Sequence, residues 1–163
     1  MVRNVHERLI NTPLTAAGVL IDKLASRDDM LWHDDWPAMR FDRPLGVGAR
    51  GGHGPVRYVV EAYEPGRSVR FRFTAPRGFV GTHGFDLVDV APGTVRLRHV
   101  LEMRVESVGR VSWPLAFRWL HDALIEDALD RAAASFGQAT TTGGRRKWSR
   151  RVRVLRWAAR YWR

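Results

Sequence analysis

Three histidines occupy positions at which the sequence pattern otherwise places apolar residues. His83 and His99 belong to runs in which apolar residues alternate, and His121 belongs to a segment with helical spacing. Each imidazole is therefore expected to share a face with its apolar neighbours. An imidazole in an apolar cavity can act as an acid, a base or a hydrogen-bonding group, and burial would keep it neutral near pH 7. His99 and His121 are candidate catalytic residues; the alternative is hydrogen-bonded pocket or core histidines without a chemical role.

The pattern along the chain predicts the elements that hold these side chains. Residues 2–10 are expected to form a first strand, and residues 15–24 a short helix, with a second short helical turn after Ser26. From Met39 to Val105 the pattern is that of strands and turns, including Pro-Gly turns at residues 64–67 and 91–94. The sheet region is expected to end at Trp113-Pro114. In residues 117–136 the apolar residues are spaced three or four apart, which predicts an amphipathic helix of about five turns.

These elements predict an α+β fold. A curved antiparallel sheet of about six to seven strands would wrap around the long C-terminal helix, with two short helices after the first strand. A sheet with one apolar face needs a cover, and this helix is the element large enough to provide it. If the sheet curls around the helix, a space opens between them.

Several segments resemble those of a known family. They are the glycine-rich connection 45–51, the hairpin 63–67 and the helical stretch 120–124. With the element order, they make residues 3–136 similar to START-domain and birch-allergen-like helix-grip proteins (the SRPBCC group), which include polyketide cyclases/dehydrases and lipid-transport proteins. The resemblance implies a deep, mostly apolar cavity for lipids, polyketides, sterols or hormones. Some relatives catalyse cyclisation or dehydration, and many only bind.

The first functional hypothesis is therefore binding of a hydrophobic or aromatic small molecule, lipid- or polyketide-like, without a cofactor or a metal ion. The second is a cyclase or dehydratase that uses His99 or His121 as general base, with Arg50 or another polar group at the cavity rim. The residues expected to contact the ligand are Phe71, Phe73, His83, Phe85, Leu97, His99, Leu101, Met103, Phe117, His121, Leu124 and Ala128.

The end of the chain has a different composition. Residues 145–163 carry nine of the 27 Lys and Arg residues and no Asp or Glu, so the net charge of +10 comes almost entirely from this tail. We expect residues 1–139 to form the ligand-binding domain and residues 140–163 to form a flexible linker and a basic amphipathic tail. Such a helix suits an anionic membrane surface or a protein partner, giving a third hypothesis, a docking module. Nucleic acid is a rival partner, and a disordered tail or a helix docked on its own domain is the remaining alternative. The residues expected to make membrane or partner contacts are Trp148, Arg153, Arg156, Trp157, Arg160 and Trp162.

Other features limit the function classes. The chain has no cysteine, which excludes disulfides, thiolate metal sites and cysteine nucleophiles. No secretory signal and no run of about 18 apolar residues is visible, so we expect a cytoplasmic protein, with peripheral membrane attachment as the alternative. Residues 46–51 match G-x-G-x-x-G, but a strand is expected after them where a dinucleotide site needs a helix, so a turn is the better interpretation.

Overall fold

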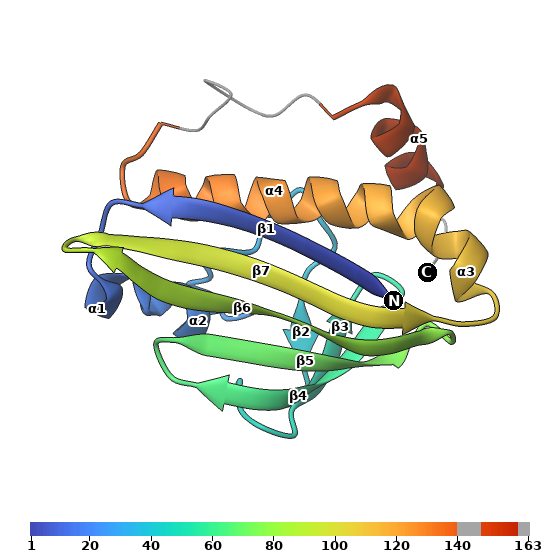
Figure 1. Ribbon diagram of the computed structural model, residues 1–163, viewed down its shortest axis with the longest axis horizontal. Coiled ribbons are helices and arrows are strands. Elements are labelled where there is room, and N and C mark those ends of the chain that lie inside the picture. The colour runs from blue at the N-terminus through green and yellow to red at the C-terminus, as the bar shows by residue number, and fades with distance from the viewer. Residues whose placement is uncertain (140–147, 160–163) are drawn as a thin grey trace.

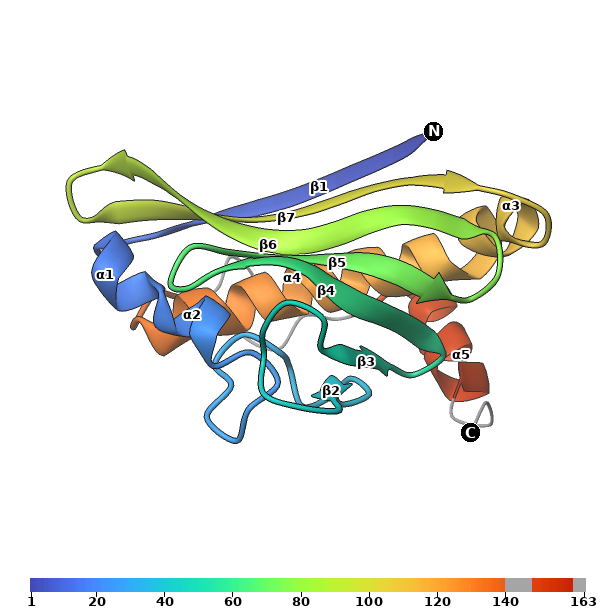
Figure 2. The same ribbon diagram turned by 90° about the horizontal axis from the view of Figure 1, so that it is seen from below.

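The computed structural model describes residues 1–139 and 148–159 (Figures 1 and 2). Seven strands form one antiparallel sheet in the order β1-β7-β6-β5-β4-β3-β2. The strands are β1 (Val2–Ile10), β2 (Arg40–Phe41), β3 (Arg50–His53), β4 (Val56–Glu64), β5 (Ser68–Ala75), β6 (Phe79–Ala91) and β7 (Thr94–Val105).

One face of this sheet is covered by a long helical segment, residues 109–135, which we call the helical arm. Figure 1 shows α4 running along β1 and β7, and Figure 2 shows the same helix behind the curved sheet. The helices are α1 (Leu14–Ala17), α2 (Val19–Asp22), α3 (Gly109–Ser112), the π-helical turn η1 (Trp113–Phe117), α4 (Arg118–Ser135) and α5 (Arg150–Ala159). The predicted α+β helix-grip architecture is confirmed, including the short helices after the first strand.

The short helices are fastened to the turn between β4 and β5. The Asp22 carboxylate accepts hydrogen bonds from the Tyr63 hydroxyl and from the backbone N–H of Gly66, both at 2.7 Å. Gly66 has a φ of +69°, which glycine adopts without steric cost. A Cβ on Gly18, between α1 and α2, would lie 2.9 Å from the Gly66 Cα atom. Two glycines thus allow the backbones to touch and close this end of the domain.

Two local predictions were wrong. No helix follows Ser26; instead the Asp29 carboxylate accepts hydrogen bonds from the backbone N–H groups of Ala25, Leu31 and Trp32, which stabilises a turn. The sheet ends at Val105 and helical structure begins at Gly109, before Trp113-Pro114. The proline lies in the first turn of the π-helical segment η1, where the hydrogen bonds of η1 do not require its missing backbone N–H.

The tail helix α5 packs against the domain. Val152 is 5% exposed and belongs to the main core cluster, and Trp148 packs beside it. The Trp148 indole N–H donates to the buried Asp127 carboxylate of α4 at 2.7 Å. This matches the docked-helix alternative for residues 148–159, whereas the predicted linker at 140–144 lies outside the described residues. None of the helices described in residues 1–139 and 148–159 has the length and apolar character needed to cross a membrane.

Candidate ligand-binding cavity and its histidine network

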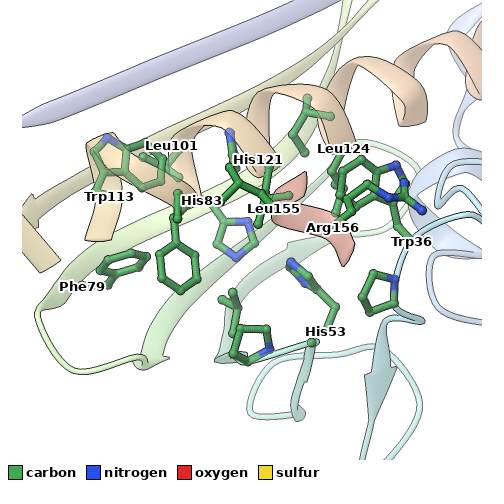
Figure 3. Close-up of a pocket in the computed structure, with 18 of the residues that line it drawn as sticks. Trp36, His53, Phe79, His83, Leu101, Trp113, His121, Leu124, Leu155 and Arg156 are labelled. Atoms are coloured by element: carbon green, nitrogen blue, oxygen red, sulfur yellow. The ribbon is translucent and has the colours of Figure 1, made fainter. Parts of the chain in front are cut away.

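A cavity of about 400 Å³ lies between the concave face of the sheet and the helical arm. Its walls come from α4, η1, strands β3 to β7, the segment before β2, and α5 (Figure 3). Most of the lining side chains are apolar, and Trp113, Phe79 and Leu101 stand at one end of the space. A hollow of this volume is within the usual range for small-molecule sites.

Eight of the twelve residues expected to contact a ligand line this cavity. They are Phe73, His83, Phe85, His99, Leu101, Phe117, His121 and Leu124. The structure places the other four in the packed core: Phe71, Leu97, Met103 and Ala128 are 0–1% exposed but do not line the hollow. Strand alternation correctly indicates which side chains point inward, but cannot indicate where along the strand the interior is filled.

Four histidines reach the cavity, from four different elements. Figure 3 shows His53, His83 and His121 directed toward the same space, and His99 also lines it. The His99 Nε2 and His83 Nδ1 atoms lie 3.4 Å apart, and the His99 and His121 ring centroids are separated by 5.0 Å. Burial lowers the pKa of His53 to about 3 and lowers the pKa of His83, His99 and His121 as well. All four are therefore neutral imidazoles at pH 7, each able to donate one hydrogen bond and accept another.

Three nitrogen atoms of these cavity histidines have no hydrogen-bond partner among the described atoms: His83 Nε2, His99 Nδ1 and His121 Nε2. His83 and His99 are only 6% and 1% exposed. A buried polar atom without a partner is costly, so a group that supplied the missing hydrogen bonds would be favoured. The cavity therefore combines apolar walls with a line of unsatisfied polar atoms.

Next to His121, polar side chains of β1 contact acidic side chains of α4 in a regular series, which we call the β1–α4 ladder. The inward face of β1 carries Asn4, His6 and Arg8, and the facing side of α4 carries Asp122, Glu126 and Asp130. Two strand residues rise about 6.6 Å and four helix residues rise about 6 Å, so successive rungs stay in register. Each strand residue thus meets one or two acidic residues of the helix.

The contacts of this ladder are hydrogen bonds and ion pairs in which the acidic residues of α4 are the acceptors. Asn4 Nδ2 donates to Asp122 at 2.9 Å, His6 contacts Asp122 at 3.3 Å and Glu126 at 2.7 Å, and Arg8 contacts Glu126 at 2.9 Å. Arg8 also contacts Asp130 at 2.8 Å. The hydrogen bonds to Asp122 and then to Glu126 raise the pKa of His6 to about 9, so His6 is a cation at pH 7.

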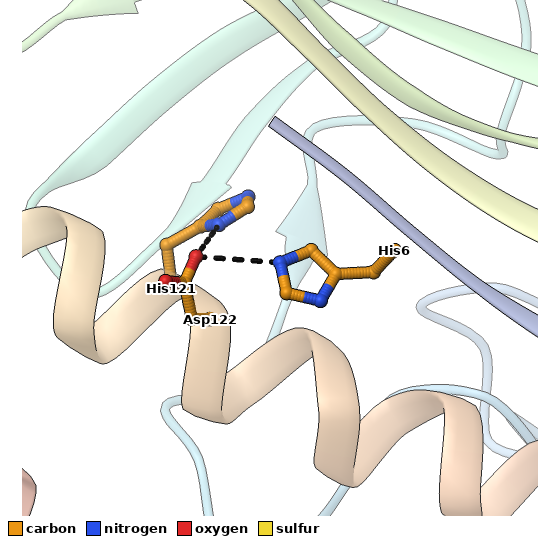
Figure 4. A group of neighbouring side chains, drawn as sticks. All are labelled: His6, His121 and Asp122. Atoms are coloured by element: carbon orange, nitrogen blue, oxygen red, sulfur yellow. Dashed lines mark hydrogen bonds and ion pairs between the residues drawn. The ribbon is translucent and has the colours of Figure 1, made fainter. Parts of the chain in front are cut away.

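Asp122 connects this ladder to the cavity (Figure 4). Its carboxylate lies 3.4 Å from His121 Nδ1. Burial alone would raise the pKa of Asp122, but the hydrogen bonds from His121, His6 and Asn4 outweigh burial and hold it well below its usual range. An ionised Asp122 selects the His121 tautomer with its proton on Nδ1, which leaves the lone pair of Nε2 toward the cavity.

His6, His121 and Asp122 also present one potential metal-ligand atom each, all within 4.8 Å of one another. Two imidazoles and a carboxylate are donors that transition-metal ions accept. In this structure the same atoms are engaged in hydrogen bonds with one another and with Glu126. We therefore interpret the group as an ion-paired network.

The α5 helix closes one side of the cavity through Leu155, Arg156 and Ala158. The Arg156 guanidinium lies between two indole rings, 3.5 Å from the Trp148 centroid and 4.3 Å from that of Trp36. Arg156 also donates to the backbone carbonyl of Asp35. The Trp36 indole N–H shares the Asp127 carboxylate with Trp148. Trp36, Trp148 and Arg156 thus form a latch that holds α5 against the segment before β2.

Other candidate residues lie elsewhere. Arg50 does not line the cavity: its side chain is exposed on β3, so its expected place at the rim is corrected. The stretch 46–51 forms a turn with Gly48 at φ +86° and then enters β3, whose first two residues are Arg50 and Gly51; no helix follows. Of the expected membrane-contact residues, Trp148 and Arg156 face the domain, Arg153 and Trp157 are exposed, and Arg160 and Trp162 lie outside the described residues.

Sequence reasoning missed His6, His53 and Asp122. His6 lies on a strand whose inward face is polar, the reverse of the usual pattern. Asp122 is an acidic residue in a helix that was recognised from the spacing of its apolar residues. A signal was present: polar residues two apart at 4, 6 and 8 match acidic residues four apart at 122, 126 and 130. His53 lies in a glycine-rich stretch without apolar alternation, so nothing in its spacing indicated its direction.

Solved structures of similar fold have low sequence identity. A Thermobifida fusca protein solved by NMR has a TM-score of 0.64 at 11% identity, covering 84% of this chain and 94% of that one. A point mutant of Thalictrum flavum norcoclaurine synthase, in complex with a transition-state analogue, has a TM-score of 0.60 at 13% identity, covering 84% and 98%. CalU16 from Micromonospora echinospora has a TM-score of 0.56 at 13% identity, covering 98% and 85%. These likenesses show the fold.

The comparison with curated proteins found no match. A family model, described as glutamate-cysteine ligase family 2 (GCS2), matches residues 16–162. This span includes the helical arm and the cavity-lining strands β3 to β7. By this match over most of its length, the chain belongs to glutamate-cysteine ligase family 2.

Proposed function

We propose that this protein binds an apolar or aromatic small molecule, lipid- or polyketide-like, in the cavity between the sheet and α4. The observation that carries the proposal is the hollow of about 400 Å³ whose apolar walls contain unpartnered nitrogens of His83, His99 and His121. A packed core would have filled this space with side chains, because protein interiors are close-packed.

The lining indicates which ligands fit. Burying apolar ligand surface contributes about 25 cal/mol per Å², so each 100 Å² adds roughly 2.5 kcal/mol. The row of neutral imidazoles suits a ligand with a hydroxyl, phenol or carbonyl group, because each imidazole offers one donor or acceptor without a charge. A flat ring would also stack against the aromatic side chains at the end near Trp113 and Phe79.

The comparisons support this proposal in different degrees. The fold shared with norcoclaurine synthase is compatible with a small-molecule site. The family description names a ligase for glutamate and cysteine, two polar amino acids with charged groups. Among the described residues that line the cavity, Asp35 and Arg156 are the acidic and basic residues, and Arg156 is stacked between two indole rings. This lining argues against two charged amino acids as ligands.

Native mass spectrometry of the purified protein, together with titration of an apolar fluorescent probe, tests the proposal. Leu124→Trp should fill the cavity and abolish probe binding, because Leu124 lines the hollow. Leu9→Trp is the matched control, since Leu9 is 50% exposed on β1. If no compound co-purifies and the wild-type protein binds no apolar probe, the proposal fails.

A second candidate function is an enzyme of the cyclase or dehydratase type. The specific observation that favours it is the contact between His121 Nδ1 and Asp122, which leaves His121 Nε2 unpartnered toward the cavity. A neutral imidazole oriented by a carboxylate can remove a proton from a bound substrate.

Replacing His121 by Gln should then abolish turnover of a polyketide-like substrate but retain its binding. Asp122→Asn should lower kcat and change the pH profile, because the tautomer of His121 is no longer fixed. His33→Gln serves as the control, since His33 does not line the cavity. Unchanged turnover in His121→Gln would eliminate this assignment and leave the binding function intact.

A further inference from the structure

A group of large apolar side chains is exposed at one end of the molecule, on α3, η1, the start of α4, and α5. The most exposed are Val108 at 72%, Val154 at 63%, Trp157 at 61% and Val111 at 60%. The α3–α5 surface is defined by six residues: Val108, Val111, Leu115, Trp119, Val154 and Trp157. Single exposed apolar residues are ordinary, but contiguous ones mark an interaction site.

The backbone brings these residues together. Residues 108, 111, 115 and 119 are spaced three, four and four apart along the helical arm, so they share one side of it. Arg151 of α5 holds the second helix beside them: it donates to the Leu115 carbonyl and lies 4.5 Å from the centroid of the Trp119 ring. Figures 1 and 2 both place α3 and α5 at the same end, opposite the β6–β7 turn.

This end is also strongly basic. Residues 107–121 and 148–159 contain six arginines and no Asp or Glu. Arg110, Arg150, Arg151 and Arg153 are exposed. Glu106, an exposed acidic residue just before this surface, forms an ion pair with Arg104. Positive charge therefore surrounds the exposed apolar side chains.

Docking of α5 changes which of its faces is available. The face with Trp148, Val152 and Leu155 packs on the domain, and the outward face presents Val154 and Trp157 among arginines. The surface offered to a partner is thus the outer side of α5 together with the start of the helical arm, not the apolar face of the tail.

We propose that the α3–α5 surface docks this protein on an anionic membrane, with the apolar side chains in the interface and the arginines among lipid headgroups. Aromatic and aliphatic side chains surrounded by arginine are typical of interfacial segments. Nucleic acid would be contacted by the arginines but would leave the aliphatic side chains without a suitable environment. A second copy of the same surface would bring like charges together.

Cosedimentation of the full chain with vesicles tests the proposal. Binding is expected to vesicles of phosphatidylcholine with about one-third phosphatidylglycerol, and to be much weaker with phosphatidylcholine alone. Arg150→Gln/Arg153→Gln should lower the partition coefficient roughly 25-fold, since each cation near an anionic surface is worth about a fivefold change. The charge-matched control Arg27→Gln/Arg40→Gln, on exposed residues outside this surface, should change it far less.

The apolar contribution is tested separately. Val111→Ser/Leu115→Ser should weaken vesicle binding at least tenfold, because two exposed aliphatic side chains no longer enter the interface. Val88→Ser/Val90→Ser, on exposed residues of β6 at the opposite end, should retain wild-type binding. Circular dichroism and thermal unfolding of each variant check that the fold is kept.

Three outcomes would overturn the proposal. The first is equal binding to neutral and anionic vesicles, or no binding to either. The second is binding to duplex DNA that depends on the arginines while Val111→Ser/Leu115→Ser binds vesicles like the wild type, which would assign the surface to nucleic acid. The third is a dimer in analytical ultracentrifugation that Val111→Ser/Leu115→Ser converts to a monomer, which would make the surface an interface between copies.

Discussion

The contribution of His6 to stability should depend on pH in a defined direction. Its pKa is about 9 in the folded protein and 6.5 in the unfolded chain, because hydrogen bonds to Asp122 and then Glu126 favour the imidazolium. A group whose folded pKa is raised stabilises the fold fully below its unfolded pKa, and this stabilisation is lost as pH rises through the folded pKa. The window therefore runs from about pH 6.5 to about pH 9.

The magnitude follows from the same two values. The difference between 6.5 and about 9, converted at about 1.36 kcal/mol per pH unit, gives a ceiling of about 3 kcal/mol. The His6 side chain is 15% exposed, so solvent screens this interaction only in part. A large fraction of the ceiling should be observable.

The perturbation is His6→Gln, which keeps hydrogen-bonding capacity without a titratable proton. The free energy of unfolding is measured by urea denaturation of wild type and variant at about pH 6 and about pH 9.5. The wild type should be more stable than the variant at the lower pH, and this advantage should shrink by about 2 to 3 kcal/mol at the higher pH. Other titrating groups cancel because both proteins carry them. An advantage that is unchanged between the two pH values would refute the protonated His6 ladder.

Three further changes test other parts of the structure. Leu129→Ala removes a fully buried side chain of α4 and should lower the free energy of unfolding by about 2–5 kcal/mol in urea denaturation. Gly18→Ala should cost about 1–3 kcal/mol, because its Cβ would lie 2.9 Å from the Gly66 Cα atom between two backbones; thermal unfolding measures the loss. Trp148→Phe keeps an aromatic ring but removes the N–H donated to Asp127, so hydrogen exchange of the α5 amides should accelerate several-fold.

Each of these predictions has a matched control. Val5→Ala changes an exposed residue of β1 and should be nearly neutral, as should Gly46→Ala, whose Cβ would meet one atom at 3.9 Å. Val80→Ala, on an exposed residue of β6, should leave α5 exchange close to the wild-type rate. Equal effects for a test and its control would contradict the packing described for that site.

Much of the fold could be predicted from local patterns. Alternation over residues 95–105 gave the buried face of β7, and the Pro-Gly turns at residues 64–67 and 91–94 gave two hairpins, since each pattern reflects a local geometric requirement. The position of the second short helix could not be obtained in this way, because Asp29 stabilises a turn through contacts that propensity does not describe.

The candidate site was predictable only where it follows sheet alternation. His83 and His99 were found because they lie on the same face of their strands as the buried apolar residues, at every second position. His6 was missed because β1 points its polar side chains inward, an arrangement stable only when α4 supplies acidic partners in register. The orientation of α5 could not be inferred, since the Asp127 carboxylate that receives two indole N–H groups comes from a different element.

The latch formed by Trp36, Trp148 and Arg156 has a kinetic consequence. Leu155, Arg156 and Ala158 make one side of the hollow, so passage of a guest molecule on that side requires α5 to detach first. Detachment is a unimolecular step whose rate does not depend on guest concentration. Uptake through this route would thus reach a plateau at high concentration, and the plateau would report the opening rate of the C-terminal helix rather than the affinity of the chamber it closes.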